Sequence, residues 1–325
     1  MTTPVTGAGA PALRRGGRAR RKARWTFDSI SFFLVFLGLP LALFLLLVIW
    51  PFVQAVFYSF TNWGGFSQDF DIIGLANYQR LVNDATFKTA LGNNIKLAIV
   101  VPLVVIVIAM IFATLVTVGG RGIGQTIGVK NSGFYRVVSF FPYVIPAVVS
   151  GVIFSKVFDP SNGLLNGLLP EGLRQNWLGQ VSTALPSSMF VIIWGAVGFY
   201  MLLFIAAIKA IPAETFEAAR LDGAGRMRTM WSITIPSIRE NIQTAWIYLG
   251  IAALDAFVYM HVLNNSGGPD NSTLVMPQYL FRLAFSQNQF GYASAVGVAM
   301  AVVTLVFAGL VFTINRLTGG TTRSS

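Results

Sequence analysis

The sequence has no cysteine and only one histidine, His261, among its 325 residues. Without thiols the chain has no disulfide framework, no thiolate metal site and no cysteine nucleophile. A single imidazole also argues against a histidine-based metal cluster or a Ser-His-Asp triad. Charge is scarce, because only 11% of the residues are charged, whereas soluble domains have about 25%. Since 54% of the residues are hydrophobic, the composition indicates a protein that crosses a membrane several times.

Long apolar stretches are what the sequence has in abundance. A helix needs roughly 20 mostly apolar residues to cross the hydrocarbon core of a membrane. Six stretches meet this requirement, at about residues 32–58, 97–118, 137–158, 189–208, 245–263 and 293–315. We therefore predict an all-α, polytopic membrane protein with six transmembrane helices. The first stretch is too long for the apolar core of a signal peptide, and its Pro40 and Pro51 favour a tilt or a kink.

The formal net charge of +11 is unevenly placed along the chain. Seven Lys and Arg residues precede residue 25, three lie in segment 119–136 and five lie in segment 209–244. Short segments rich in Lys and Arg stay on the cytoplasmic side, so both termini are predicted to be cytoplasmic. Ahead of a long apolar stretch, the basic arm is a topology signal rather than a nucleic-acid site. We predict a disordered basic arm at residues 1–28, one membrane domain at 29–318 and a short tail at 319–325.

Two segments predicted on the opposite side, residues 61–92 and 159–186, differ in character from the cytoplasmic ones. They are rich in Asn, Gly and Asp, and they contain Trp63 and Trp177. They are either ordered caps that contact an external protein or simple connections between spans.

Residues 212–236 form a charged island between two apolar stretches. Pro212 suits a helix start, where its missing N–H costs nothing. Glu214 lies in the first turn and Arg220 comes later, an order that suits the helix dipole. The charged island is either an ordinary amphipathic surface helix or a handle that a soluble partner grips from the cytoplasm.

Glycines divide the charged island. Gly223 and Gly225 are predicted to end the first helix, since glycine tolerates the backbone angles of a sharp reversal. A second short helical turn follows them. The product is predicted to be a compact knob with Phe216 and Ala219 on one side and Glu217 exposed.

The spacing within the charged island resembles a known pattern. Glu-Ala-Ala occupies 217–219, Gly223 follows after three intervening residues, and Ile-x-Ile-Pro ends at Pro236. This closely resembles the E-A-A-x3-G-x9-I-x-L-P loop of permease subunits of binding-protein-dependent ABC importers, and the only departure is Ile235 in place of Leu. Other segments resemble the carbohydrate-uptake, maltose-type, first-permease branch, and these are FPYVIP at 141–146, FDP at 158–160, GLLN at 163–166, GGP at 267–269 and GYASA at 291–295.

The resemblance implies a type I ABC importer permease fold, with the charged island as a coupling helix seated in a cleft of an ATP-hydrolysing subunit. The coupling residues that it implies are Glu217, Ala218, Ala219, Asp222, Gly223 and Pro236. It also implies a second permease subunit, two ATPase subunits that bind ATP and Mg, and an extracytoplasmic solute-binding protein, in the plasma membrane of a bacterium. The implied solute is a sugar, with a glycerol phosphate or a polyol as the alternative.

Polar and aromatic residues within the spans are candidates for the substrate pathway. Asp255 is the clear intramembrane carboxylate of the sequence, and a polar group at membrane depth is expected to have a function. Tyr259 lies one helical turn further. Tyr143 lies between two prolines that free backbone carbonyls and open the helix, and Tyr200 lies on the fourth stretch. Contact with a partner helix is the alternative for Asp255, and core packing or an interfacial position is the alternative for the tyrosines.

Several motifs are absent. The sequence has no G-x-x-x-x-G-K-[ST] run, the phosphate-binding loop of many ATPases, so we expect the chain to bind no cofactor or metal and not to be an enzyme. A self-sufficient secondary carrier is one rival, but many such carriers have internal repeats and charged pathway residues. An integral membrane enzyme is another, but it requires a cluster of catalytic polar groups. Neither feature is apparent in the sequence.

Overall fold

The computed structural model describes residues 27–67, 69–117 and 131–317 of the chain. The predicted tail and most of the predicted disordered arm lie outside these residues, although a helix already begins at Phe27. Within the described part, four helices are long and apolar enough to cross a membrane, and two bent helix pairs bring the number to six if each pair is one span. The predicted all-α membrane architecture is thereby confirmed. The chain forms two compact units, residues 1–53 and 54–325.

An irregular helix fills the described part of the first unit. Its segments are α1 (Phe27–Phe33), η1 (Leu34–Gly38), α2 (Leu39–Phe44), η2 (Leu45–Ile49) and the start of α3 (Trp50–Tyr58). Pro40 and Pro51 each occupy the second residue of an α-helical segment, directly after one of the π-helical turns η1 and η2. Proline has no N–H to donate, and a π turn shifts the backbone hydrogen bonds to a wider register that tolerates this missing bond. The helix therefore continues past both prolines.

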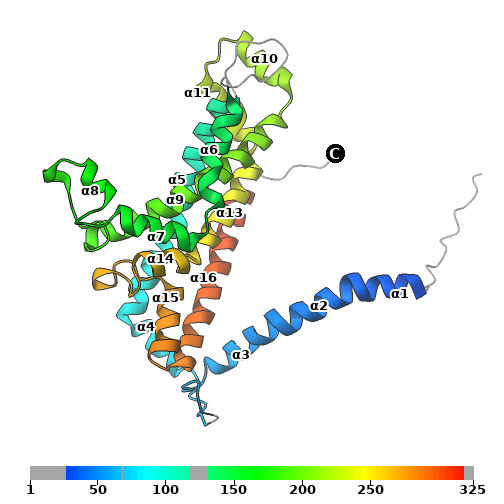
Figure 1. Cartoon of the computed structure of the whole chain (residues 1–325). Coiled ribbons are helices and arrows are strands. Elements are labelled where there is room, and N and C mark those ends of the chain that lie inside the picture. The colour runs from blue at the N-terminus through cyan, green and yellow to red at the C-terminus, as the bar shows by residue number, and fades with distance from the viewer. Residues whose placement is uncertain (1–26, 68, 118–130, 318–325) are drawn as a thin grey trace, which may run out of the picture. The chain divides into compact units, whose positions relative to one another are not determined.

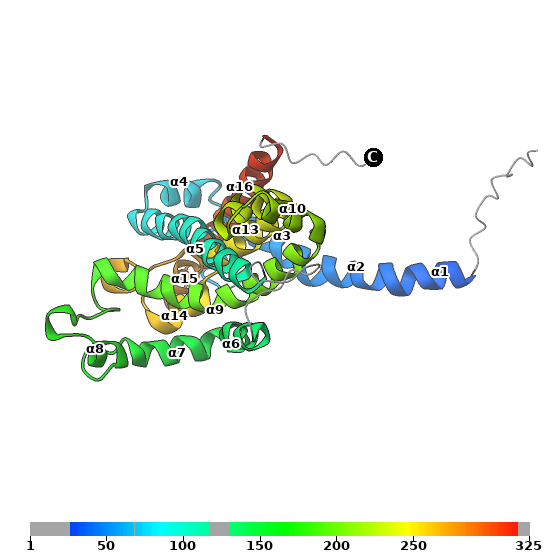
Figure 2. The same cartoon turned by 90° about the horizontal axis from the view of Figure 1, so that it is seen from above.

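The second unit is a bundle of helices (Figures 1 and 2). Its elements are α4 (Ala76–Asn83), α5 (Ala85–Thr117), α6 (Ser132–Val144), α7 (Ala147–Val157), α8 (Leu164–Leu168), η3 (Glu171–Leu173), α9 (Val181–Lys209), α10 (Ala213–Leu221), α11 (Arg226–Thr229), η4 (Met230–Thr234), α12 (Ile235–Ser237), α13 (Arg239–Leu254), α14 (Phe257–Leu263), η5 (Pro269–Asn271), α15 (Met276–Phe281), η6 (Arg282–Ser286) and α16 (Phe290–Leu317). Helices α5, α9 and α13 run side by side, with α10 at one end of the bundle and α4 and α15 toward the other (Figure 1). Helices α5 and α9 begin well before the predicted apolar stretches, because hydropathy detects the apolar run and not the polar first turns.

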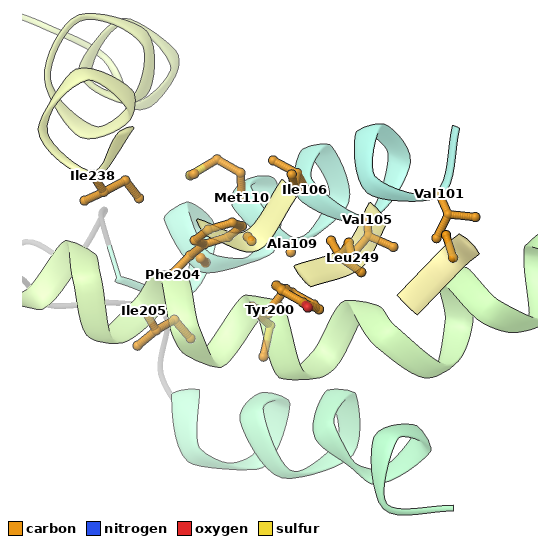
Figure 3. Packing of buried hydrophobic residues seen from close by; sticks show 14 of the residues in the cluster. Val101, Val105, Ile106, Ala109, Met110, Tyr200, Phe204, Ile205, Ile238 and Leu249 are labelled. Atoms are coloured by element: carbon orange, nitrogen blue, oxygen red, sulfur yellow. The ribbon is translucent and has the colours of Figure 1, made fainter. Parts of the chain in front are cut away.

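The core of this bundle lies between α5, α9 and α13 (Figure 3). Val101, Val105 and Ala109 recur at helical spacing on α5 and are buried, so they form one continuous face. Phe204 of α9 and Leu249 of α13 pack against that face. Lipid tails are as apolar as these side chains, so close packing rather than removal from water holds the helices together.

Two of the predicted spans are broken. Helices α6 and α7 meet at an angle of 96°, and α13 and α14 meet at 45°. Pro146 removes a backbone donor and forces Ile145 into an extended conformation (φ −75°, ψ 125°), because the residue before proline disfavours the helical region. The predicted opening of the helix near Tyr143 is confirmed, and the predicted span at 137–158 consists of two helices, α6 and α7, on either side of this break. The second break falls at Asp255 and Ala256.

Candidate functional site

The charged island folds as the predicted knob. Helix α10 follows Pro212, whose extended backbone (φ −53°, ψ 135°) stops the helix from beginning earlier. Phe216 is 2% exposed and packs into the core with Met230 and Ile238. Ala219 is buried as well, so the predicted inner side is confirmed. Glu217 is half-buried rather than exposed, because it lies at the edge of the face that Phe216 buries.

The turn after α10 has the hydrogen bonds of a Schellman motif. The Gly223 N–H donates to the Arg220 carbonyl at 3.0 Å, and the Ala224 N–H donates to the Ala219 carbonyl at 2.9 Å. Gly223 has a φ of +73°, in the left-handed region that glycine enters without steric cost. Its predicted role in ending the helix is confirmed. Gly225 has no positive φ, so the helix reversal depends on the first glycine alone.

Three large apolar side chains project from the knob. Leu221 is 90% exposed, Met227 is 60% exposed and Trp231 is 64% exposed. The predicted coupling residues Ala218, Asp222, Gly223 and Pro236 are also exposed on this loop. Exposed apolar side chains on a charged loop indicate a contact surface. Sequence reasoning missed them, although Leu221 stands out as an apolar residue at the polar end of the helix.

The broken helix α6 presents an aromatic platform. The ring of Tyr143 stacks on the ring of Phe199 with centroids 4.6 Å apart and planes at 18°. The ring of Tyr200 meets Phe199 edge-on, with centroids 5.2 Å apart. Tyr200 of α9 and Tyr259 of α14 lie in the vicinity of Tyr143. The structure therefore brings together three of the four predicted pathway residues from α6, α9 and α14.

Two glycines of α9 make this platform possible. A Cβ at Gly198 would lie 1.7 Å from the Ser139 carbonyl oxygen of α6, so the two backbones touch at a point where no side chain fits. A Cβ at Gly195 would lie 3.3 Å from the Tyr259 hydroxyl. Sequence reasoning missed both positions. Small residues at a helix crossing are the signal for close approach in membranes, and these two lie three residues apart on one face.

Asp255 occupies the bend between α13 and α14. Its backbone N–H still bonds to the Ile251 carbonyl at 3.1 Å, and its side chain is exposed. In the part of the chain that the structure describes, no hydrogen bond or ring contact joins its carboxylate to the three tyrosines. The role of Asp255 thus stays a prediction, and the bend that it occupies is the structural finding.

At the end of the bundle away from α10, polar side chains fasten the broken helices. The Asn93 amide donates to the Leu274 carbonyl at 2.9 Å. The neighbouring Asn94 amide donates to the Leu254 carbonyl at 2.7 Å, and its oxygen accepts from the Met276 N–H at 2.6 Å. Both asparagines are buried. They tie α5 to the end of α13 and to the segment where α15 starts. Backbone groups at helix ends have no partner within the helix, and the two asparagines supply one.

A carboxylate completes this network. One oxygen of Asp84 accepts hydrogen bonds from the hydroxyls of Tyr279 and Tyr292, the latter at 2.6 Å. Its other oxygen accepts from the N–H groups of Thr86 and Phe87 at 2.8 and 3.2 Å, so it caps the first turn of α5. We call the side chains of Asp84, Asn93, Asn94, Tyr279 and Tyr292 the polar clasp.

The hydrogen bonds of the polar clasp shift the pKa values of Asp84 and Tyr279. Burial raises the pKa of Asp84, but the four donors outweigh burial and hold this pKa below the ordinary value of 3.8. Burial, together with the bond to Asp84, raises the pKa of Tyr279 to about 12. The guanidinium of Arg80 lies 3.9 Å from the centroid of the Tyr292 ring. Within the polar clasp, an ionised carboxylate is therefore held by neutral tyrosines.

A cavity of about 780 Å³ lies between α5, α13 and α16. Aliphatic side chains together with Trp246 and Phe307 line it. Such a lining offers almost no hydrogen bonds to hydroxyl groups, so this cavity is not a sugar site. The aromatic platform suits a polar solute better.

The sequence is similar to known membrane components of transport systems. Residues 118–319 match the family described as "Binding-protein-dependent transport system inner membrane component". The diacetylchitobiose uptake system permease protein NgcF of Streptomyces coelicolor is 54% identical over 311 residues, which cover 94% of this chain and 88% of that protein. The multiple sugar-binding transport system permease protein MsmF of Streptococcus mutans is 34% identical over 271 residues, which cover 82% of this chain and 89% of that protein.

A solved structure has a similar fold. One chain of a bacterial alginate ABC transporter, crystallised in complex with an alginate pentasaccharide-bound periplasmic protein, superimposes with a TM-score of 0.75. The match covers 90% of this chain and 98% of that chain at 22% sequence identity. At this identity the similarity concerns the fold.

Proposed function

The chain belongs to the family of binding-protein-dependent transport system inner membrane components, and we propose that it is the permease subunit through which an ATP-driven importer moves a sugar into a bacterial cell. The observation that carries this proposal is the knob of residues 212–236. It combines the Glu-Ala-Ala pattern with a Schellman turn and exposed apolar side chains. A surface of that kind suits rigid-body coupling to a separate motor.

The ATP would be hydrolysed by partner subunits. In this proposal each of two ATPase subunits binds ATP and Mg, and this chain binds no cofactor. Its knob sits in a cleft of one ATPase subunit, with Leu221 and Met227 entering apolar contacts and Glu217 facing a basic group. Gly223 keeps the reversal tight. A second permease subunit completes the pathway, and an extracytoplasmic solute-binding protein delivers the sugar to the end of the bundle where the polar clasp lies.

This arrangement sets the orientation of the chain in the plasma membrane. The knob faces the cytoplasm together with both termini, as the distribution of Lys and Arg favours. The segments around the polar clasp and α8 then face outward.

The sugar is proposed to be a short oligosaccharide of N-acetylated amino sugars, of which diacetylchitobiose is the first to test. The high identity with NgcF over almost the whole chain supports this choice. Stacked aromatic faces such as those of Tyr143 and Phe199 suit the apolar faces of sugar rings, while phenol hydroxyls suit their hydroxyl groups. Tyr143 is 48% exposed, so its ring is available for such contact.

Uptake by the reconstituted importer tests this proposal. Proteoliposomes that contain both permeases and the ATPase subunits are supplied with the solute-binding protein, ATP and radiolabelled solutes. We expect saturable, ATP-dependent uptake of diacetylchitobiose, competed by related oligosaccharides and not by glycerol phosphate. Uptake of glycerol phosphate or of a polyol alone would show that the alternative solute class is correct.

A matched pair of substitutions tests the aromatic platform. Tyr143→Ala should raise the concentration for half-maximal uptake about tenfold, since each aromatic contact contributes about 1 kcal/mol beyond its buried area. Tyr135→Ala removes another half-exposed tyrosine of α6 and should leave this concentration unchanged.

Asp255→Ala should change solute affinity more than it changes assembly of the complex. If it instead abolishes assembly, Asp255 contacts a partner helix.

A further inference from the structure

Two adjoining cavities lie along α5 and α9, and α6 also lines one of them. One, of about 480 Å³, lies at the end of the bundle that carries the polar clasp. The other, of about 520 Å³, lies deeper along the same helices. Both are lined by Val100, Pro186 and Met189. The shared lining shows that the two cavities adjoin, and we call them together the α5–α9 groove.

The upper part of the α5–α9 groove carries both signs of charge. Lys96 of α5 and Asp270 of η5 line it, with the hydroxyl side chains of Thr89 and Ser182 between the helices. Both charged side chains are exposed, and within the described part of the chain they form no ion pair with each other or with another residue. The upper groove therefore offers an unpaired cation and an unpaired anion to an occupant.

The lower part of the α5–α9 groove is apolar. Val104, Ile108 and Phe112 of α5 and Phe190 and Trp194 of α9 line it, and none of its lining residues is charged. Lys96 is the last charged residue of α5 before the apolar run that continues to Thr117. A lysine at this point of a span lies at the level of the lipid headgroups. The lining of the groove thus changes from charged to apolar at the depth where a lipid changes from its charged headgroup to its apolar acyl chains.

We propose that the α5–α9 groove binds one phospholipid with a zwitterionic headgroup, such as phosphatidylethanolamine. The lipid phosphate pairs with Lys96, the lipid ammonium pairs with Asp270, and one acyl chain fills the lower groove. Charge-assisted bonds of this kind are stronger than neutral ones. A neutral sugar fits less well, because it makes no use of either charge and finds few hydrogen bonds in the lower part.

Native mass spectrometry of the complete importer tests the headgroup site. The complex is transferred from nanodiscs that contain equal amounts of phosphatidylethanolamine and phosphatidylglycerol, and the retained lipids are counted. We expect the wild type to retain phosphatidylethanolamine preferentially, and Lys96→Gln to lower its retention about tenfold. Asp270→Asn should abolish the preference over phosphatidylglycerol, which has no ammonium group. Asparagine tolerates the positive φ of 51° at this position.

Controls separate this site from general lipid binding. Lys88→Gln changes another exposed lysine of α5, which does not line the groove, and should leave retention unchanged. Val104→Trp should displace the acyl chain, whereas Val107→Trp on the neighbouring exposed surface should not. Equal retention in wild type and Lys96→Gln would overturn the proposal. So would a photoreactive residue at position 108 that crosslinks to the second permease and not to lipid.

Discussion

The two ends of the helical bundle hold their shape by different means. At the charged island, short-range backbone bonds such as Gly223 N–H to Arg220 O close the turn. At the polar clasp, side chains reach across the chain, as when the Tyr292 hydroxyl bonds to Asp84 over 208 positions. The charged island is thus specified locally and presents apolar side chains outward, while the polar clasp is specified by long-range contacts and buries most of its polar side chains. The first arrangement suits a handle and the second suits a fixed frame.

The largest effect is expected from substitutions on the island surface. Leu221→Asp and Glu217→Lys should each lower ATP-coupled uptake about thirtyfold or more, because loss of a central interface contact costs about 2 kcal/mol or more. Uptake in proteoliposomes and co-purification of the ATPase subunits measure the effect. Leu168→Asp alters a leucine of α8 that is 75% exposed and should have little effect on co-purification. Unaltered uptake in both island variants would contradict the coupling role.

A clasp substitution should affect stability instead. Asn94→Leu leaves the Leu254 carbonyl and the Met276 N–H buried without partners, at a cost of about 1–3 kcal/mol for each group. We expect a lower midpoint of thermal unfolding of the purified complex. Asn83→Leu changes an exposed asparagine that bonds only within its own helix and should change the midpoint little. Equal midpoints for the two variants would show that the clasp does not frame the bundle.

A smaller effect separates the two glycines of the island. Gly223→Ala places a Cβ at a φ of +73°, which costs about 1–2 kcal/mol although nothing crowds the position. It should reduce coupled uptake by several fold while leaving membrane insertion intact. Gly225→Ala needs no such backbone angle and should retain uptake. If the two variants behave alike, the Schellman turn is not what holds the knob.

The smallest effect is the acid sensitivity of the clasp. Because the folded pKa of Asp84 is below 3.8, its stabilising contribution is present above that value and is lost as pH falls through the lowered folded pKa. Solvent reaches this carboxylate, so screening limits the contribution to about 1 kcal/mol at most. Unfolding midpoints at about pH 6 and about pH 3 should differ less for Asp84→Asn than for the wild type. An equal acid decrease in both proteins would contradict this assignment.

Local features could be predicted from the sequence. The six apolar stretches, the helix start after Pro212, the reversal at Gly223 and the inner face of Phe216 and Ala219 each depend on residues close together in the chain. Their causes are backbone sterics and helical periodicity. The opening of the helix near Tyr143 belongs to the same class, because a proline acts on its immediate neighbours.

The amino-acid sequence by itself thus determined a six-span helical chain with a knob of recognisable pattern. Only the tertiary structure decided that α6 and α7 diverge by 96°, that Tyr143 stacks on Phe199, and that Asn94 joins α5 to α13 and α15. These contacts join residues far apart in the chain, and their free energy depends on distances and angles that folding sets. Proline spacing shows where a helix can break, but neighbouring helices decide the angle at which it does.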